Sequence, residues 1–356
     1  MHRGKFGMNK KFWKNKKVFL TGHTGFKGSW LSLWLQTLGA ELFGYALEPE
    51  TTPNLFNIAS VAKQMTSYFG NILDKDTLEK KISDFKPEII IHMAAQPLVR
   101  RSYEDPKLTY QTNVMGTLNL LEALRKSKST VVFINVTTDK CYENNEWHWG
   151  YRENEKLGGY DPYSSSKACS EILTSSYRNS FFSSYDVALA TARAGNVIGG
   201  GDFSQDRLLP DFFKSLDLSK NVVIRNPSAI RPWQHVLCPL SGYLLLAERM
   251  FSNPKKYSEA WNFGPSDDDA RNVKWIIEKL CSMPNDKKID FIINKETNSL
   301  HEATYLKLDC SKARSELNWE PKMNLNLALK NIWDWHQAYS NNHDMHEFTL
   351  HQIKNY

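Results

Sequence analysis

The chain has 356 residues, of which 41% are apolar and 24% are charged, and its formal net charge is +6. This composition is typical of a globular protein and excludes collagen-like, disordered and membrane-embedded chains. The length predicts one large domain with a smaller attached lobe. Seven basic residues and no acids lie among the first 17 residues, so residues 1–16 are expected to form a basic N-terminal lead-in.

The sequence contains no apolar run of about 18 residues and no signal-type apolar segment. We therefore expect no membrane contact and a cytoplasmic location. We interpret the basic N-terminus as solvated rather than as a nucleic-acid anchor, although its charge is compatible with an anionic small substrate. The five cysteines form no Cys-x-x-Cys pair and indicate reduced thiols, and we expect no metal site.

Apolar runs alternate with helical periodicity through the first two hundred residues. Strands are predicted at residues 18–20, 41–47, 89–93, 131–136 and 187–193, with helices between them. Continuous apolar strands separated by helices predict an α/β fold with a Rossmann-like, doubly wound parallel sheet that is covered on both faces. We assign this dinucleotide-binding domain to residues 17–200.

The turn-rich run at residues 195–202 ends this alternation. We expect residues 201–340 to form mainly a smaller, mixed α/β substrate-binding lobe, from which a part could return to the main sheet. Within this lobe a strand is predicted near residue 222 and helices near residues 240 and 273. Residues 341–356 are expected to be a polar C-terminal tail.

The first predicted strand runs into a glycine turn that opens a helix. Gly22, Gly25 and Gly28 follow the spacing Gly-x-x-Gly-x-x-Gly, and glycines there let backbone N–H groups approach a pyrophosphate at a helix N-terminus. A turn with only a structural role is the alternative. Glu48 lies where an acid binds the ribose hydroxyls and disfavours a 2′-phosphate, so NAD is predicted in preference to NADP.

A second group of side chains follows the strand predicted at residues 131–136. Thr138 stands at the end of that strand, and Tyr163 and Lys167 are four residues apart on one face of a helix that Pro162 would start. Tyr163 can accept a hydroxyl proton if nearby positive charge lowers the pKa of its phenol from the usual value near 10. This arrangement predicts hydride transfer between an alcohol and NAD.

Asp139 and Lys140 follow Thr138 directly and add an acid and a base that simple alcohol oxidation does not need. Together with the glycine turn, Tyr163 and Lys167, this pattern resembles the extended short-chain dehydrogenase/reductase superfamily and, within it, the nucleotide-sugar 4,6-dehydratases. Most of those carry Asp-Glu where this chain has Asp-Lys. That departure resembles the CDP-glucose branch of the family.

Further stretches strengthen the resemblance, which covers roughly residues 12–338. They are GHTGFKGSWL from Gly22, HMAAQPLVR from His92, RAGNVIGGGD from Arg193 and RPWQHVL from Arg231. Two positions depart from the family pattern. Asn71 stands where an Asp near the adenine is usual, and Cys238 stands where an acid is expected.

The resemblance also implies which residues bind the cofactor and the substrate. The implied NAD contacts are Gly22, Gly25, Phe26, Lys27, Gly28, Glu48, Asn71, Ile72, Ala94, Ala95, Gln96, Asn113, Tyr163 and Lys167. The substrate candidates are Gln96, Asn196, Arg207, Arg231 and His301, because arginine in particular offers paired donors to a diphosphate. Gln96 and Asn113 could equally cap buried backbone groups, and each arginine could be a structural ion-pair partner.

The activity implied by the resemblance is the conversion of CDP-glucose to CDP-4-keto-6-deoxyglucose, a lyase reaction that feeds deoxysugar synthesis for lipopolysaccharide O-antigens. After oxidation at C4, Lys140 would remove the C5 proton and protonated Asp139 would donate to the departing C6 hydroxyl, before hydride returns to C6. The likeness also implies a homodimer that pairs the helices bearing Leu118 and Tyr163, with a tetramer as the alternative.

Other functions stay open at this point. A nucleotide-sugar 4-epimerase needs the hydride-transfer group but not Asp139 with Lys140. A dTDP- or GDP-sugar dehydratase is a further alternative, because no residue identifies the nucleotide base. A non-catalytic NAD-sensing protein of the same fold would have no use for the activated phenol of Tyr163.

Overall fold

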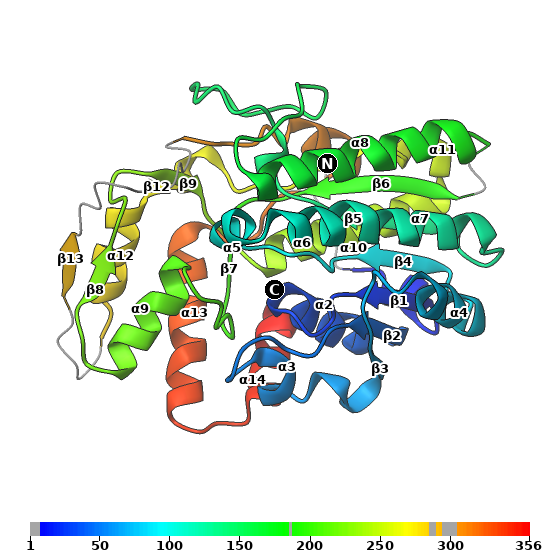
Figure 1. The fold of residues 1–356 in the computed structure, drawn as a ribbon. Coiled ribbons are helices and arrows are strands. Elements are labelled where there is room, and N and C mark those ends of the chain that lie inside the picture. The colour runs from blue at the N-terminus through cyan, green and yellow to red at the C-terminus, as the bar shows by residue number, and fades with distance from the viewer. Residues whose placement is uncertain (1–7, 185–186, 285–289, 294–304) are drawn as a thin grey trace, which may run out of the picture.

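The computed structural model describes residues 8–184, 187–284, 290–293 and 305–356. Within these ranges the centre of the molecule is a seven-stranded parallel sheet in the order β11-β6-β5-β4-β1-β2-β3 (Figure 1). The strands are β1 (Lys17–Thr21), β2 (Glu41–Ala46), β3 (Thr66–Phe69), β4 (Ile89–His92), β5 (Val132–Val136), β6 (Ala188–Arg193) and β11 (Ala260–Asn262). The strand order reverses between β1 and β4, and such a switch point opens a ligand crevice at the carboxyl ends of the strands.

Alternate residues of the strands pack into two cores on opposite faces of the sheet. Val18 and Leu20 of β1 share one core with Trp30 of the first long helix, whereas Phe19 shares the other with Leu120. Full burial of consecutive residues is expected for a parallel sheet that helices cover on both faces. The covering helices are α2 (Phe26–Thr37) and α10 (Leu237–Ser252) on the first face, and α4 (Lys75–Phe85), α7 (Gly116–Lys126) and α8 (Pro162–Phe181) on the second.

The smaller lobe has a core of its own beside the carboxyl edge of the sheet (Figure 1). Phe212, Ile276 and Leu329 are fully buried there. Its elements are α9 (Leu208–Asp217), β8 (Val222–Ile224), β9 (Ile230–Pro232), β12 (Ala270–Asn272), α12 (Val273–Cys281), β13 (Phe291–Ile293) and α13 (Leu325–Ser340). Between β9 and β12 the chain leaves this lobe and adds β11 to the main sheet beside β6.

Short elements connect these units and carry several of the functional side chains. The helices among them are α1 (Lys10–Trp13), α3 (Leu55–Ile58), α5 (Val99–Glu104), α6 (Pro106–Tyr110), α11 (Pro254–Tyr257) and α14 (Met345–Asn355). The single helical turns are η1 (Val61–Gln64), η2 (Gln111–Met115), η3 (Asp139–Cys141), η4 (Asp267–Asp269) and η5 (Ala313–Leu317), and the paired short strands are β7 (Val197–Ile198) and β10 (Gln234–His235). Over the described ranges, no helix is long and apolar enough to cross a membrane.

Both ends of the described chain pack against the body of the molecule, which differs from the expected lead-in and tail. Helix α1 buries Trp13, whose indole N–H donates to Glu248 at 2.7 Å. The segment expected to be a polar tail forms α14, which buries Met345 and Ile353, and the ring of Tyr356 lies edge-on to a tryptophan of α2. The helices α1 and α14 make this contact with few apolar residues. Their sequences therefore show no clear helical periodicity of apolar residues.

Candidate active site

The predicted glycine turn connects β1 to α2 and requires glycine at two of its positions. Gly22 has φ of 76°, and a Cβ there would lie 2.7 Å from the backbone nitrogen of Ala94. A Cβ on Gly28 would lie 2.0 Å from the carbonyl oxygen of Gly22. The turn is therefore tight, and its glycines place no side chain over the backbone N–H groups at the N-terminus of α2. This is the arrangement that binds pyrophosphates.

A cavity of about 290 Å³ opens in front of this turn, and we call it the smaller cavity. Most of the predicted cofactor residues line it: Gly22, Gly25, Phe26, Lys27, Gly28, Glu48, Asn71, Ile72, Ala94, Ala95 and Gln96. They come from the carboxyl ends of β1, β2, β3 and β4 and the segments that follow, which the parallel sheet brings to one edge. The size and lining suit the adenosine and pyrophosphate parts of a dinucleotide.

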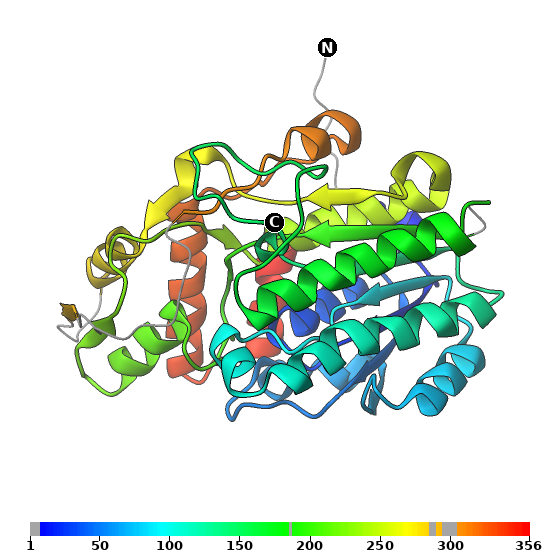
Figure 2. The same cartoon turned by 45° about the horizontal axis from the view of Figure 1, so that its top comes forward.

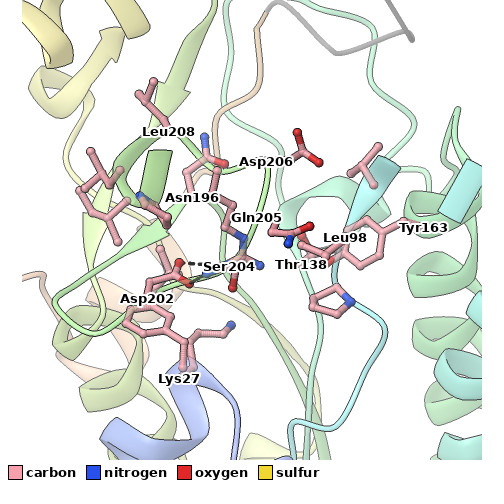
Figure 3. A pocket seen from close by; sticks show the side chains of 18 of the residues that line it. Lys27, Leu98, Thr138, Tyr163, Asn196, Asp202, Ser204, Gln205, Asp206 and Leu208 are labelled. Atoms are coloured by element: carbon pink, nitrogen blue, oxygen red, sulfur yellow. Dashed lines mark hydrogen bonds and ion pairs between the residues drawn. The ribbon is translucent and has the colours of Figure 1, made fainter. Parts of the chain in front are cut away.

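A larger cavity of about 840 Å³ lies between the sheet and the smaller lobe and shares Phe26, Lys27 and Arg207 with the smaller one. Figure 3 shows Tyr163 facing it from α8, with Asn196 and Asp202 contributed by the segment that follows β6. The predicted site residues that line it are Phe26, Lys27, Thr138, Asp139, Lys140, Tyr163, Asn196, Arg207 and Arg231. The structure therefore brings most of the predicted catalytic and substrate groups together around one cavity.

Tyr163 and Lys167 lie in the first turns of α8, which begins at the N-cap Asp161 and at Pro162. Both side chains are buried, and Nζ of Lys167 donates to the carbonyl oxygen of Val136 at 3.4 Å. Burial raises the pKa of Tyr163 to about 12, although its hydrogen bond with Thr138 and the charge of Arg207 act to lower it. Burial also lowers the pKa of Lys167 to about 8, against the charge of Glu171. The sequence analysis predicts that nearby positive charge lowers the pKa of this phenol. In the structure the effect of burial is larger, and the pKa is raised.

Asp139 occupies η3 directly after β5 and is 2% exposed. Its Oδ1 accepts a hydrogen bond from Oγ1 of Thr138 at 3.0 Å, whereas its Oδ2 is buried and has no hydrogen-bond partner among the described residues. Burial raises the pKa of Asp139, against the charge of Lys140 and the hydrogen bond from Thr138. A buried acid of this kind is favoured in its protonated form and can donate to a group in the cavity.

Positive charge gathers where the two cavities meet. Burial, together with the charges of Lys167 and Arg207, lowers the pKa of Lys27 to about 7. Arg207 donates to Oδ2 of Asp202 at 3.1 Å, and Nδ2 of Asn196 is buried without a partner among the described residues. Clustered cations and unpaired donors in a cavity suit a diphosphate.

Arg231 and His301 complete the predicted substrate residues. Arg231 lies in β9, lines the larger cavity, and donates to the carbonyl oxygen of Ile230 at 3.0 Å. Its charge is among those that act on the carboxyl group of Asp139. His301 lies outside the described residues.

Gln96 and Asn113 hold backbone and side-chain groups in the way that the alternative interpretation predicts. The side chain of Asn113 accepts from the N–H of Gln96 at 2.9 Å and donates to Ser166 on α8 at 2.9 Å. The amide of Gln96 donates to Thr109 at 2.9 Å and accepts from the N–H of Leu98 at 2.7 Å. Gln96 therefore shapes its own loop beside the smaller cavity and does not line the larger one, which argues against the predicted substrate role.

The two departures from the family pattern have different surroundings. Asn71 lines the smaller cavity, and its Oδ1 accepts from the N–H of Leu73 at 3.0 Å. Cys238 lies on α10, is fully buried and is hydrogen-bonded to the hydroxyl of Tyr356. Cys238 lines neither cavity. The change from an acid to cysteine therefore affects the packing of Tyr356 at the C-terminus and not the lining of the site.

Asp202 and Arg100 are among the charged residues at this site that sequence reasoning missed. Asp202 has a side chain that is 6% exposed, lines both cavities and holds Arg207. Arg100 on α5 lines the larger cavity and forms an ion pair with Asp206 at 3.8 Å. Both residues end stretches that carry the family resemblance, but only the tertiary structure shows which charges they meet. In the parts of the chain that the structure covers, no cluster of His, Cys, Asp and Glu is suited to hold a metal ion.

The fold and the site together define an enzyme of the extended short-chain dehydrogenase/reductase superfamily, which confirms the resemblance predicted from the sequence. The chain belongs to the GDP-mannose 4,6-dehydratase family, whose sequence profile matches residues 19–332. It is 51% identical over 354 residues to the CDP-glucose 4,6-dehydratase of Salmonella typhimurium, with 98% of each chain covered. It is 24% identical to a dTDP-glucose 4,6-dehydratase of Xanthomonas campestris, with 89% of this chain and 92% of the relative covered.

Solved structures share the same fold at lower identity. An epimerase from Methanothermobacter thermautotrophicus superposes with a TM-score of 0.78 and 21% identity, covering 93% of this chain and 95% of that chain. A dTDP-glucose 4,6-dehydratase from Bacillus anthracis in complex with NAD superposes with a TM-score of 0.74 and 21% identity, covering 92% and 98%. These likenesses confirm the predicted fold class.

Proposed function

We propose that the chain is an NAD-dependent CDP-glucose 4,6-dehydratase. The observation that carries the proposal is the buried Asp139, whose Oδ2 has no partner among the described residues, beside Tyr163 in the larger cavity. An epimerase has no need of an acid there, because it neither removes nor adds water. The 51% identity to the Salmonella enzyme supports CDP-glucose as the substrate, against 24% to the dTDP-glucose enzyme.

The smaller cavity suits the adenosine and pyrophosphate parts of NAD. The glycine turn leaves no room for side chains where a pyrophosphate approaches, Lys27 adds a cation, and Glu48 offers a carboxylate to the ribose hydroxyls. When bound, NAD supplies the acceptor for the hydride from C4 of the sugar and the donor for its return at C6. An acid at Glu48 disfavours the additional phosphate of NADP.

The side chains around the larger cavity divide the proton movements between them. Tyr163 takes the proton of the C4 hydroxyl, with Thr138 hydrogen-bonded to the same oxygen. Once C4 is a ketone, Lys140 takes the proton from C5, and Asp139 gives its proton to the C6 hydroxyl, which leaves as water. Arg207, Arg231 and Asn196 hold the diphosphate. When hydride returns to C6, Lys140 gives the proton back to C5, so NAD and the base are both regenerated in each turnover.

Purified protein with CDP-glucose, dTDP-glucose and UDP-glucose in parallel tests the proposal. We expect a 4-keto-6-deoxy sugar, smaller than the substrate by one water, from the CDP sugar in preference to the others. A product of unchanged mass with inverted C4 would identify an epimerase instead. Selective conversion of the dTDP sugar would overturn the choice of nucleotide.

We also propose a homodimer formed through α7 and α8, which lie side by side (Figure 2). Large apolar side chains are exposed on and beside these helices: Tyr110, Met115, Ile172 and Phe181. Ile172 is 57% exposed in the middle of α8. A second copy that packs its own α7 and α8 on this face would bury this patch.

Replacing Ile172 by Glu places a charge in the middle of the proposed dimer face. We expect Ile172→Glu to lower the molar mass in light scattering after gel filtration toward that of a monomer. Val223→Glu is the matched control, because Val223 is 55% exposed on β8 in the other lobe. An unchanged mass for Ile172→Glu, or equal effects of both variants, would contradict the proposed interface.

A further inference from the structure

Helix α8 clamps the end of β5 at two consecutive residues. Nζ of Lys167 donates to the carbonyl oxygen of Val136 at 3.4 Å, and Oγ1 of Thr137 donates to Oε1 of Glu171. Lys167 and Glu171 are four residues apart and lie on one face of α8. The next residue along the chain, Thr138, belongs to the proposed catalytic group. The two hydrogen bonds to α8 therefore involve the residues directly before the catalytic ones.

The carboxylate of Glu171 is the centre of a buried ion pair with Arg193. Nε of Arg193 donates to Oε1 at 2.9 Å and Nη2 donates to Oε2 at 2.9 Å. Both side chains are 3% exposed. Burial acts to raise the pKa of Glu171, but the charge and hydrogen bonds of Arg193 outweigh it, so the pKa is lowered. A bidentate pair of this kind has a fixed geometry.

Arg193 also connects this ion pair, along the chain, to the segment that packs against the carboxyl group of Asp139. Arg193 ends β6 and is followed two residues later by Gly195, where a Cβ would lie 1.7 Å from Oδ2 of Asp139. Thr137 stands two residues before Asp139, directly after the end of β5. The pair Glu171–Arg193 is thus connected both to the segment that precedes Asp139 and to the segment that packs against its carboxyl group.

We propose that Thr137 is a positioning residue, which through Glu171 and Arg193 holds Thr138 and Asp139 in register with Tyr163 and thereby couples hydride transfer to water elimination. This inference rests on the proposed dehydratase activity. The hydroxyl of Thr137 is directed at Glu171, so it acts through its neighbours and not on the substrate. Its loss would let the end of β5 move against α8, which would affect Asp139 in the turn after β5 more than Tyr163 on the helix.

Thr191 provides a matched control within the same cluster. Its hydroxyl donates to Oε2 of Glu171 at 2.7 Å, and like Thr137 it is buried. Thr191 lies within β6, however, and its chain neighbours Ala190 and Ala192 are core residues. A valine at either position removes one hydrogen bond to the same carboxylate, but only the change at Thr137 adjoins the catalytic residues.

The experiment is a single turnover of CDP-glucose by wild type and by Thr137→Val, Thr137→Ser and Thr191→Val, stopped with acid and analysed by mass. The measured ratio is 4-ketoglucose, oxidised but still carrying its C6 hydroxyl, to 4-keto-6-deoxyglucose. We expect Thr137→Val to raise this ratio by about tenfold to a hundredfold, because a misplacement near 1 Å lowers a rate by up to about a hundredfold. Thr137→Ser should restore the wild-type ratio.

Thermal unfolding separates positioning from general stability. Thr137→Val and Thr191→Val should both lower the unfolding midpoint, whereas only the first should change the ratio. Equal ratios in these two variants, with active wild type, would overturn the inference and leave the dehydratase proposal intact. If Thr137→Val does not fold, Thr137→Ala is measured in its place by the same criterion. Wild type that leaves CDP-glucose unchanged would overturn the proposed function and this inference with it.

Discussion

Gly195→Ala tests the assigned role of Asp139 with the addition of one methyl group. A Cβ at Gly195 would lie 1.7 Å from Oδ2 and 2.2 Å from Cγ of Asp139, whereas ordinary contact begins at 3.4 Å. The carboxyl group must therefore retreat by about 1.7 Å, since a close-packed interior gives little elsewhere. A misplacement near 1 Å costs about a hundredfold in rate, so we expect at least that loss in the elimination step.

The assay for Gly195→Ala follows the reduced nicotinamide by absorbance and the sugar product by mass. We expect reduction of the cofactor to persist while the 4-keto-6-deoxy product falls about a hundredfold. Gly264→Ala is the control, because Gly264 is also buried but its Cβ would meet atoms at 3.2 Å and beyond. Full turnover by a well-folded Gly195→Ala would refute the assignment of Asp139 as the proton donor.

Two further substitutions test other parts of the site. Lys140→Met should abolish exchange of the C5 hydrogen with deuterated water while substrate-dependent reduction of the nicotinamide remains detectable, and unchanged turnover would exclude Lys140 as the base. Burial lowers the pKa of His92 to about 3, so the folded protein keeps this ring neutral between Thr21 and Thr117, whereas the unfolded chain protonates it below about 6.5. The contribution of His92 to the free energy of unfolding should be fully present above about pH 6.5. It should fall by up to about 1.4 kcal/mol per pH unit as the pH decreases toward 3. Urea unfolding at a series of pH values should show a shallower acid slope for His92→Gln, and an identical slope would contradict a neutral buried ring.

The parallel sheet and the glycine turn are predictable from sequence because their signals are local. Each strand is a short apolar run, and Gly22, Gly25 and Gly28 stand directly between such a run and a helical periodicity. The boundaries predicted for β5 and β6 agree with the structure within one residue. In contrast, α14 has few apolar residues, and only its contact with the body shows which face is buried.

The candidate site shows the same division. Thr138, Asp139, Lys140, Tyr163 and Lys167 are recognisable because their spacing places them at a strand end and on a helical face. The use of the Gln96 amide within its own loop depends on Thr109, which a local pattern does not reveal. The raised pKa of Tyr163 and the lowered pKa of Lys27 likewise depend on burial, which sequence does not specify.

By itself the sequence determined the chemistry available to this protein. It supplied a dinucleotide turn, a phenol with a lysine one helical turn away, and an acid and a base behind one strand, because each of these is encoded over a few consecutive residues. Only the tertiary structure decided how that chemistry is controlled. Gly195 packs against Asp139, and Glu171 accepts a hydrogen bond from Thr137, so segments far apart in the chain meet at this site. The protonation of the buried carboxyl groups of Asp139 and Glu171 depends on burial, and burial exists only once those segments have packed together.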